Sequence, residues 1–159
     1  MAQLGLTERE LHAWRTSFRM VELLRARIEQ QLQATSGLSN ADYTVLVLLA
    51  EAPGRRMRSY ELAQTAGWEK SRMHHQLTRM SRRGLVTREP CGSRGIHAVL
   101  TTEGLSALRK AVPGHAQEVR RLFVDRLTPE ELEQFAGLAA KILDNLEEGE
   151  PLTNDAPDS

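Results

Sequence analysis

The chain has 159 residues, of which 40% are hydrophobic and 26% charged, so it is long enough for one domain with a real core and too apolar for a disordered protein. Its single cysteine, Cys91, excludes an internal disulfide and fits a reducing cytoplasm. No apolar run approaches the ~18 residues that a membrane span needs, and the first ten residues lack the pattern of a signal peptide. We therefore expect a cytoplasmic protein with no membrane contact.

The charges are distributed unevenly, although the formal net charge is zero. Between Pro53 and Gly95 there are three acids (Glu61, Glu69 and Glu89) against ten basic residues. The ten are Arg55, Arg56, Arg58, Lys70, Arg72, Arg79, Arg82, Arg83, Arg88 and Arg94. A basic middle between acidic ends predicts an anionic partner for the middle.

The first predicted helix begins after Thr7, because Thr7 and Glu10 form the pattern of a capping box. It should run to about Leu32, before the break at Ser36 and Gly37. Its apolar stripe needs either the domain core or a second subunit as a partner. The stripe consists of Leu11, Trp14, Phe18, Val21, Leu24 and Ile28.

A second helix should follow Ser39 or Asn40 and end at Pro53-Gly54. Residues 41–50 are apolar on nearly all sides, which predicts the buried centre of the domain. Residues 56–58 could form a brief strand. We expect Ser59 to cap a helix over 60–66, which Gly67 ends.

Residues 68–83 predict an amphipathic helix with a basic, donor-rich exposed face. Met73, Leu77 and Met80 share one stripe, whereas His75 and its neighbours on the opposite side carry no acid after Glu69. A solvated surface helix would show the same pattern. A short helix, a Gly-containing turn and a basic helix are also typical of a helix-turn-helix.

Two predicted strands, 85–88 and 96–100, follow directly after Gly84, which should stop the basic helix. The turn-forming segment 89–95 joins them into a hairpin. A basic helix followed by a hairpin predicts a winged helix-turn-helix, so the expected fold class is mainly α with a small β wing.

Two further helices should complete the chain. Thr101 or Thr102 should cap a helix from Glu103 to about Arg126, with a kink or break at Pro113-Gly114. Thr128-Pro129 is a strong helix start. The apolar stripe of that last helix consists of Leu132, Phe135, Leu138, Ala139, Ile142, Leu143 and Leu146. Residues 148–159 should form a disordered acidic tail.

The order of these elements and several motifs resemble the MarR (multiple antibiotic resistance regulator) family of bacterial transcription factors. The likeness covers residues 7–147. The matching positions are Leu62-Ala63, Leu77, Arg79, Gly84-Leu85-Val86, Arg88, Arg94, Val99-Leu100-Thr101 and Gly104. The chain departs from the family pattern at Glu69, where Ser or Asp is the usual cap, and at Cys91 and Ser93 in the wing.

The resemblance implies one domain over 1–147, with dimerisation helices at 7–35 and 102–147 and a DNA-binding module at 38–100. It further implies a homodimer on a palindromic double-stranded DNA operator, acting as a repressor. A small aromatic or apolar ligand would bind between the dimerisation helices and the winged module and release the repressor. A protein-interaction module that uses the same fold without binding DNA is the alternative.

Eleven residues form the candidate DNA-binding set. Ser71, Arg72, His74 and His75 occupy the first turns of the recognition helix, where base contacts are made. In an arbitrary protein, Arg94 in the wing would be interpreted as a solvated loop arginine. Its position in the family pattern instead favours insertion into the minor groove. Phosphate contacts and helix capping account for the others, which are Ser39, Arg58, Ser59, Lys70, Arg79 and Arg88.

The residues give no support to catalysis or to a cofactor. His74 and His75 are adjacent and lack the i, i+4 spacing with which two helical histidines share a metal. A metal site would need residues from several elements or subunits. Cys91 could weaken DNA binding if it were oxidised, although an incidental surface thiol is the simpler interpretation. We expect no enzyme, no metal and no cofactor.

Overall fold

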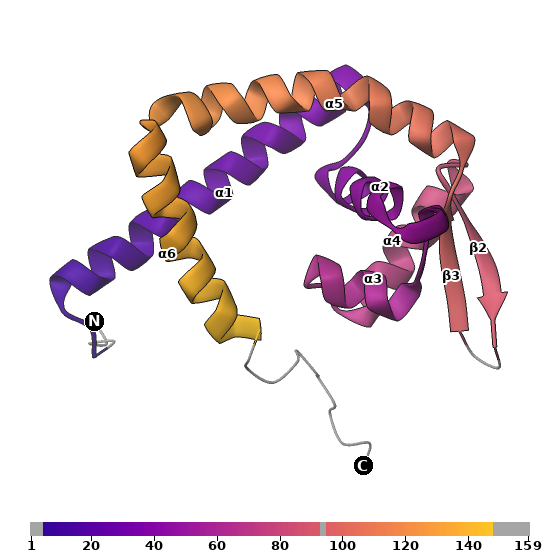
Figure 1. Ribbon diagram of the computed structural model, residues 1–159, viewed down its shortest axis with the longest axis horizontal. Helices are drawn as coiled ribbons and strands as arrows, with labels where there is room; N and C mark the ends of the chain where they lie inside the picture. The colour runs from indigo at the N-terminus through magenta and orange to yellow at the C-terminus, as the bar shows by residue number, and fades with distance from the viewer. Residues whose placement is uncertain (1–4, 93–94, 148–159) are drawn as a thin grey trace, which may run out of the picture.

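The computed structural model describes residues 5–92 and 95–147 (Figure 1). The described elements in chain order are α1 (Glu8–Ser36), α2 (Asn40–Glu51), η1 (Pro53–Arg55), β1 (Arg56–Arg58), α3 (Ser59–Ala66), α4 (Lys70–Arg82), β2 (Val86–Cys91), β3 (Gly95–Leu100), α5 (Thr102–Leu122), η2 (Val124–Arg126) and α6 (Pro129–Glu147). The mainly helical fold with a small wing is confirmed. The expected tail at 148–159 lies outside the described residues.

Helix α2 lies at the centre of the core, as its apolar composition predicts. Val45, Leu46 and Leu49 are fully buried. The buried stripe of α4 packs into the same hydrophobic cluster, with Met73 and Leu77 almost inaccessible to solvent. This shared core fixes which face of α4 remains exposed.

The wing belongs to a three-stranded antiparallel sheet in the order β1-β3-β2. Its two long strands extend further into the predicted turn than expected, and the pairing continues to Pro90 opposite Ile96 and Cys91 opposite Gly95. Because β2 is an edge strand, Pro90 can lack its N–H there without breaking the ladder. Ser93 and Arg94, at the tip, lie outside the described residues.

The predicted helix caps are confirmed at Thr7, Ser39, Thr101 and Thr128, where each hydroxyl accepts a backbone N–H of the first turn. The prediction for Ser59 is wrong. Ser59 is the first helical residue of α3, and its hydroxyl donates to the Ile96 carbonyl at 3.0 Å. The helix start is instead held by Glu61, whose carboxylate accepts the Arg58 amide.

Helix α5 passes through Pro113 without the expected break and ends at Leu122, four residues before the predicted Arg126. It lies beside α1 for much of its length (Figure 1). A Cβ atom at Gly114 would lie 2.9 Å from the Gln31 side-chain nitrogen, so glycine allows this close approach. Gly114 therefore lies at a close contact between α5 and α1.

Helix α6 turns away from the end of α5 and stands apart from the winged module in Figure 1. Leu138, Ile142, Leu143 and Leu146 on this helix are 53–65% exposed. On α1, Trp14 and Phe18 are also more than half exposed, with ring centroids 4.1 Å apart. Among the helices that the structure describes, none has the length and apolar character to cross a membrane.

Candidate nucleic-acid interface

The exposed face of α4 is set by the residues that it buries. Met73, Gln76, Leu77 and Met80 face the core, so the exposed side chains of the first turns are those at 70–72, 74 and 75. Gly67 ends α3 in the left-handed conformation and allows the turn into α4. Glu69 occupies the N-cap without a side-chain cap bond, in line with the departure from the family pattern.

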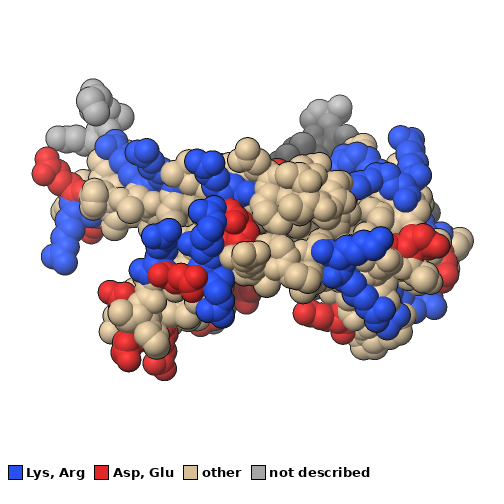
Figure 2. All heavy atoms as spheres, turned by 90° about the horizontal axis from the view of Figure 1, so that it is seen from above, with Lys and Arg blue, Asp and Glu red and all other residues tan. Residues whose placement is uncertain are grey.

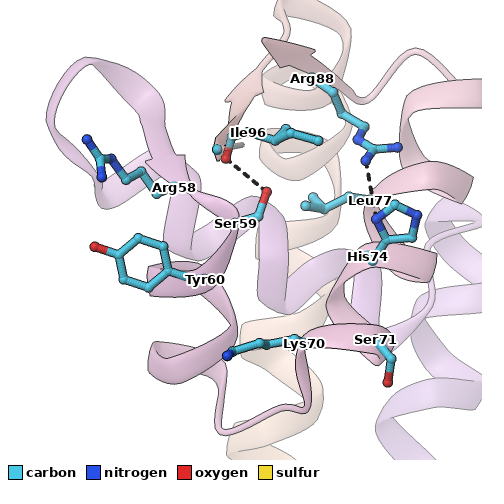
Figure 3. Close-up of a pocket in the computed structure, with 10 residues that line it drawn as sticks. Arg58, Ser59, Tyr60, Lys70, Ser71, His74, Leu77, Arg88 and Ile96 are labelled. Carbon is cyan, nitrogen blue, oxygen red and sulfur yellow. Dashed lines mark hydrogen bonds between the residues drawn. The ribbon is translucent and has the colours of Figure 1, made fainter. Parts of the chain in front are cut away.

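A pocket of about 420 Å³ lies where β1, α3, α4 and the wing meet (Figure 3). It collects six of the eleven predicted DNA-binding residues. These six are Arg58, Ser59, Lys70, Ser71, His74 and Arg88. Tyr60, Leu77, Gly95 and Ile96 complete the lining, and within the described ranges no acidic side chain borders the pocket. Three cations and several hydroxyl or ring donors therefore line one concave surface.

Four predicted residues lie outside this pocket. Ser39 has its hydroxyl engaged as the cap of α2. Arg72 stacks on Trp68, with its guanidinium 4.1 Å from the ring centroid, and His75 lies edge-on to His74. Arg79 donates to the Gln76 side chain. The eleventh, Arg94, cannot be placed because it lies outside the described residues.

Arg88 extends from β2 toward α4. Its Nη1 donates to Thr78 Oγ1 at 3.1 Å, and its Nη2 lies 3.3 Å from His74 Nδ1 (Figure 3). Among the described residues, its buried Nε has no hydrogen-bond partner. The guanidinium is thus held against α4 at the wall of the pocket.

A buried polar network behind α4 was not predicted from the sequence. Asp42 is 3% exposed and accepts hydrogen bonds from Gln76 Nε2 at 2.7 Å and from Arg83 Nη1 at 2.6 Å. Its second role is in the capping box with Ser39. The available signal was Gln76, a polar residue in phase with the apolar stripe of α4.

The same network reaches the end of α1. Arg83 Nη2 donates to the Gly37 carbonyl at 2.9 Å, and Glu29 on α1 accepts the backbone N–H of Asn40 at 2.6 Å. The C-terminal ends of α1 and α4 and the N-terminal end of α2 are therefore joined by hydrogen bonds.

Figure 2 views the molecule from the side on which α5 lies. Basic and acidic side chains are interspersed along this face rather than gathered into one patch. The pocket between α3, α4 and the wing, whose described lining includes three basic residues and no acid, thus differs from the charge pattern of this face.

Comparison with known proteins identifies the family of the chain. The family model described as "MarR family" matches residues 36–95. AbsC, a MarR family transcriptional regulator from Streptomyces coelicolor, is 42% identical, with 91% of this chain and 98% of that chain covered and a TM-score of 0.84. The chain belongs to the MarR family.

Two further relatives support the assignment. Sco3205, a MarR family transcriptional regulator from Streptomyces coelicolor solved in complex with DNA, is 39% identical, with 89% of this chain and 93% of that chain covered and a TM-score of 0.85. The HTH-type transcriptional repressor YetL of Bacillus subtilis (strain 168) is 29% identical over 115 residues, 71% of this chain and 68% of YetL. This MarR-family chain is a winged-helix transcription regulator and not an enzyme.

Within residues 5–92 and 95–147, no three His, Cys, Asp or Glu side chains gather as a metal site would require. Cys91, a free thiol, is partly exposed at the end of β2.

Proposed function

We propose that this MarR-family regulator is a cytoplasmic homodimeric repressor that binds an inverted-repeat operator in double-stranded DNA. The observation that carries the proposal is the pocket between α3, α4 and the wing, which Arg58, Lys70 and Arg88 line and which no acidic side chain of the described residues lines. A concave cationic surface beside the first turns of an exposed helix suits a DNA strand whose major groove receives that helix.

The proposed contacts divide by chemistry. Ser71, Arg72, His74 and His75 are exposed on the first turns of α4 and would face base edges. Arg58, Ser59, Lys70 and Arg79 would face phosphates, as would the start of α2 at Ser39. Arg88 adds positive charge to the pocket wall, and Arg94 would enter the minor groove from the wing tip.

Exposed apolar side chains support the homodimer. Trp14 and Phe18 on α1 and Leu143 on α6 present large apolar surfaces to solvent in the single chain. Contiguous exposed apolar surface is typical of a protein interface. We propose that 7–35 and 102–147 form the dimer contact and that 38–100 forms the DNA-binding module within a single domain, 1–147.

A two-fold dimer would present two recognition helices and so would bind half-sites about one helical turn (~10 bp) or a multiple apart. The repressor role is supported by the name of the relative YetL. Release by a small aromatic or apolar ligand rests on family resemblance, and thermal-shift screening with phenolic compounds tests it. A continued absence of ligands would remove this part of the proposal.

Binding of purified protein to duplexes enriched from a random pool, compared with scrambled duplexes, tests the central claim. Lys70→Ala should weaken binding to both duplexes. It should also reduce the slope of log affinity against log salt concentration by about one unit, since one phosphate contact is lost. Arg72→Ala should cost about 1–3 kcal/mol on the enriched duplex and much less on the scrambled one.

Arg109→Ala removes one positive charge at an exposed position of α5 outside the pocket, and it should change neither the affinity for the two duplexes nor the salt dependence. Salt-independent binding, or no binding at low salt, would favour the alternative in which the module contacts a protein instead of DNA.

A further inference from the structure

The guanidinium of Arg88 is committed to the recognition helix. Arg88 pairs with Ala98 in the sheet register, and Ala98 is fully buried, so the Arg88 side chain leaves β2 on the face that packs against the helices. Nη1 and Nη2 meet Thr78 and His74, and Nε is closed off from solvent. Because these contacts hold it against α4, Arg88 is poorly placed to extend toward a phosphate.

The contact with His74 determines where the imidazole proton lies. A guanidinium only donates hydrogen bonds, so Nδ1 of His74 must offer its lone pair to Arg88. The ring is then neutral and carries its proton on Nε2. His74 is exposed on α4, so this Nε2–H is a donor available at the interface.

The surroundings of His74 are consistent with this tautomer. The charged and titratable groups of the pocket are Arg58 from β1, Tyr60 from α3, Lys70 from α4 and Arg88 from β2, and His75 lies edge-on to the ring. None of these is a carboxylate. Among the described residues of the pocket, a proton on Nδ1 would therefore have no carboxylate acceptor and would face the Arg88 donor instead.

We propose that Arg88 is a positioning residue that fixes His74 as an Nε2–H donor for DNA recognition, while making no base contact itself. An imidazole N–H matches the acceptors of the major groove, such as guanine N7 and O6 or thymine O4. This inference rests on the proposed DNA-binding function. It assigns part of the operator specificity to a residue of the wing strand that lies behind the recognition helix.

The tautomer can be measured without DNA, by ¹⁵N NMR of histidine-labelled protein at about pH 8. In the wild-type protein, His74 should be the Nε2–H form, and Arg88→Met should raise the share of the Nδ1–H form, because Nδ1 no longer accepts a hydrogen bond. Arg88→Lys is the second variant. Its single ammonium retains the charge but cannot hold both Thr78 and His74 in the fork geometry, so it should change the His74 tautomer in the same direction as Arg88→Met. A predominant Nδ1–H form in the wild-type protein would overturn the proposal.

A matched control exists on the opposite face of the sheet. Arg56 Nη2 lies 3.1 Å from His97 Nδ1, a contact of the same kind between other elements. Arg56→Met should change the signals of His97 and leave those of His74 as in the wild-type protein. A change at His74 in this control would mean that any loss of sheet charge alters the ring.

The role in recognition is tested with the duplex enriched by the wild-type protein and its scrambled counterpart. At about pH 8, Arg88→Met should weaken binding to the enriched duplex about tenfold, because one directional hydrogen bond is lost. Binding to the scrambled duplex should weaken less.

A double-mutant cycle completes the design. In His74→Gln the side-chain amide nitrogen supplies a donor near the place of Nε2 without a tautomer, so Arg88→Met should cost less than about twofold in that background. An unchanged cost there, or an equal deficit on both duplexes, would overturn the positioning role. If the wild-type protein bound neither duplex, the proposed function would fail, whereas the NMR result would still decide the contact between Arg88 and His74.

Discussion

Asp42 shows how one buried carboxylate connects the core to the recognition helix. It accepts hydrogen bonds from Gln76, from Arg83 and from the Ser39 amide, and it is almost fully buried. Each buried donor that loses its acceptor costs about 1–3 kcal/mol. The side chain is therefore worth more to stability than a surface ion pair.

Asp42→Ala should lower the free energy of unfolding by about 3 kcal/mol or more, since several donors lose their acceptor together. Arg83→Ala should lower it by less than Asp42→Ala, because Asp42 keeps the Gln76 and Ser39 donors and the Arg83 side chain is 44% exposed. Urea denaturation measures both. Equal losses for the two variants would show that Asp42 acts only through Arg83.

His115 on α5 is a second residue whose burial has consequences. Its ring centroid lies 4.2 Å from that of Tyr43 on α2, and its Nδ1 is buried without a partner among the described residues. Burial lowers the pKa of His115 and raises the pKa of Tyr43. The folded protein thus favours the neutral imidazole.

Because the folded pKa of His115 is lowered, the unfolded chain binds the proton more readily. The contribution of His115 to stability should be complete above the unfolded value of about 6.5 and should decline as the pH falls through it. His115→Gln should reduce the loss of stability between about pH 7.5 and about pH 5.5, whereas His12→Gln, at an exposed position of α1, should not. Identical slopes for all three proteins in urea denaturation would contradict this.

At the scale of elements, the start of α5 is closely fitted to the end of the recognition helix. Gly104 forms the first turn after the Thr101 cap, and a Cβ atom there would lie 2.1 Å from the Leu85 carbonyl oxygen. Thr101 in turn donates to the Gly84 carbonyl at 2.7 Å. The strand-to-helix turn therefore has no room for a side chain.

Gly104→Ala should lower the free energy of unfolding by about 1–3 kcal/mol, although alanine favours a helix, because the backbone oxygen cannot move away. Gly137→Ala in α6 is the matched control. A Cβ there meets nothing within 4 Å, so this change should raise stability by about 0.5–1 kcal/mol. A stabilising Gly104→Ala in thermal or urea denaturation would show that the turn relaxes.

Local signals were sufficient for most elements of the fold and insufficient for long-range contacts. Capping patterns at Thr7, Ser39 and Thr128 act within one helical turn, so the sequence predicts them. Ser59 was misassigned because its hydroxyl bonds Ile96, 37 residues away, once the sheet has formed. The sequence predicts a kink or break at Pro113, and α5 continues through it, with α1 approaching at Gly114 in a tertiary contact that local signals do not show.

The candidate site follows the same division. The exposed basic positions of α4 follow from helical periodicity, and the structure confirms that the predicted stripe of Met73, Leu77 and Met80 is buried. Periodicity could not show that Arg88 turns toward His74 or that Asp42 and Gln76 meet across two helices, since both pairs depend on how separate elements pack. The DNA-binding function of the candidate site remains a prediction.

For the whole molecule, the proposed dimer makes a direct prediction. Leu143→Glu, at a half-exposed position on the apolar face of α6, should convert a dimer of 17.9 kDa chains into monomers, because a charge would be buried in the interface. Lys141→Glu places the same charge on the opposite face of α6 and should remain dimeric. Sedimentation at micromolar concentration measures both, and a wild-type monomer would exclude the dimer.

In the proposed dimer, the hydrogen bonds at the C-terminal end of α1 would transmit to α2 and α4 a tilt of this helix. Its 29 residues span about 43 Å, and its C-terminal end is joined to α2 through Glu29 and to α4 through Gly37 and Arg83. A tilt of about 5° at the far end would shift the joined end by about 4 Å, close to the ~3.4 Å rise of one base pair. A change of a few degrees in the angle at which two copies of α1 cross would therefore change the half-site spacing that the dimer fits by about one base pair.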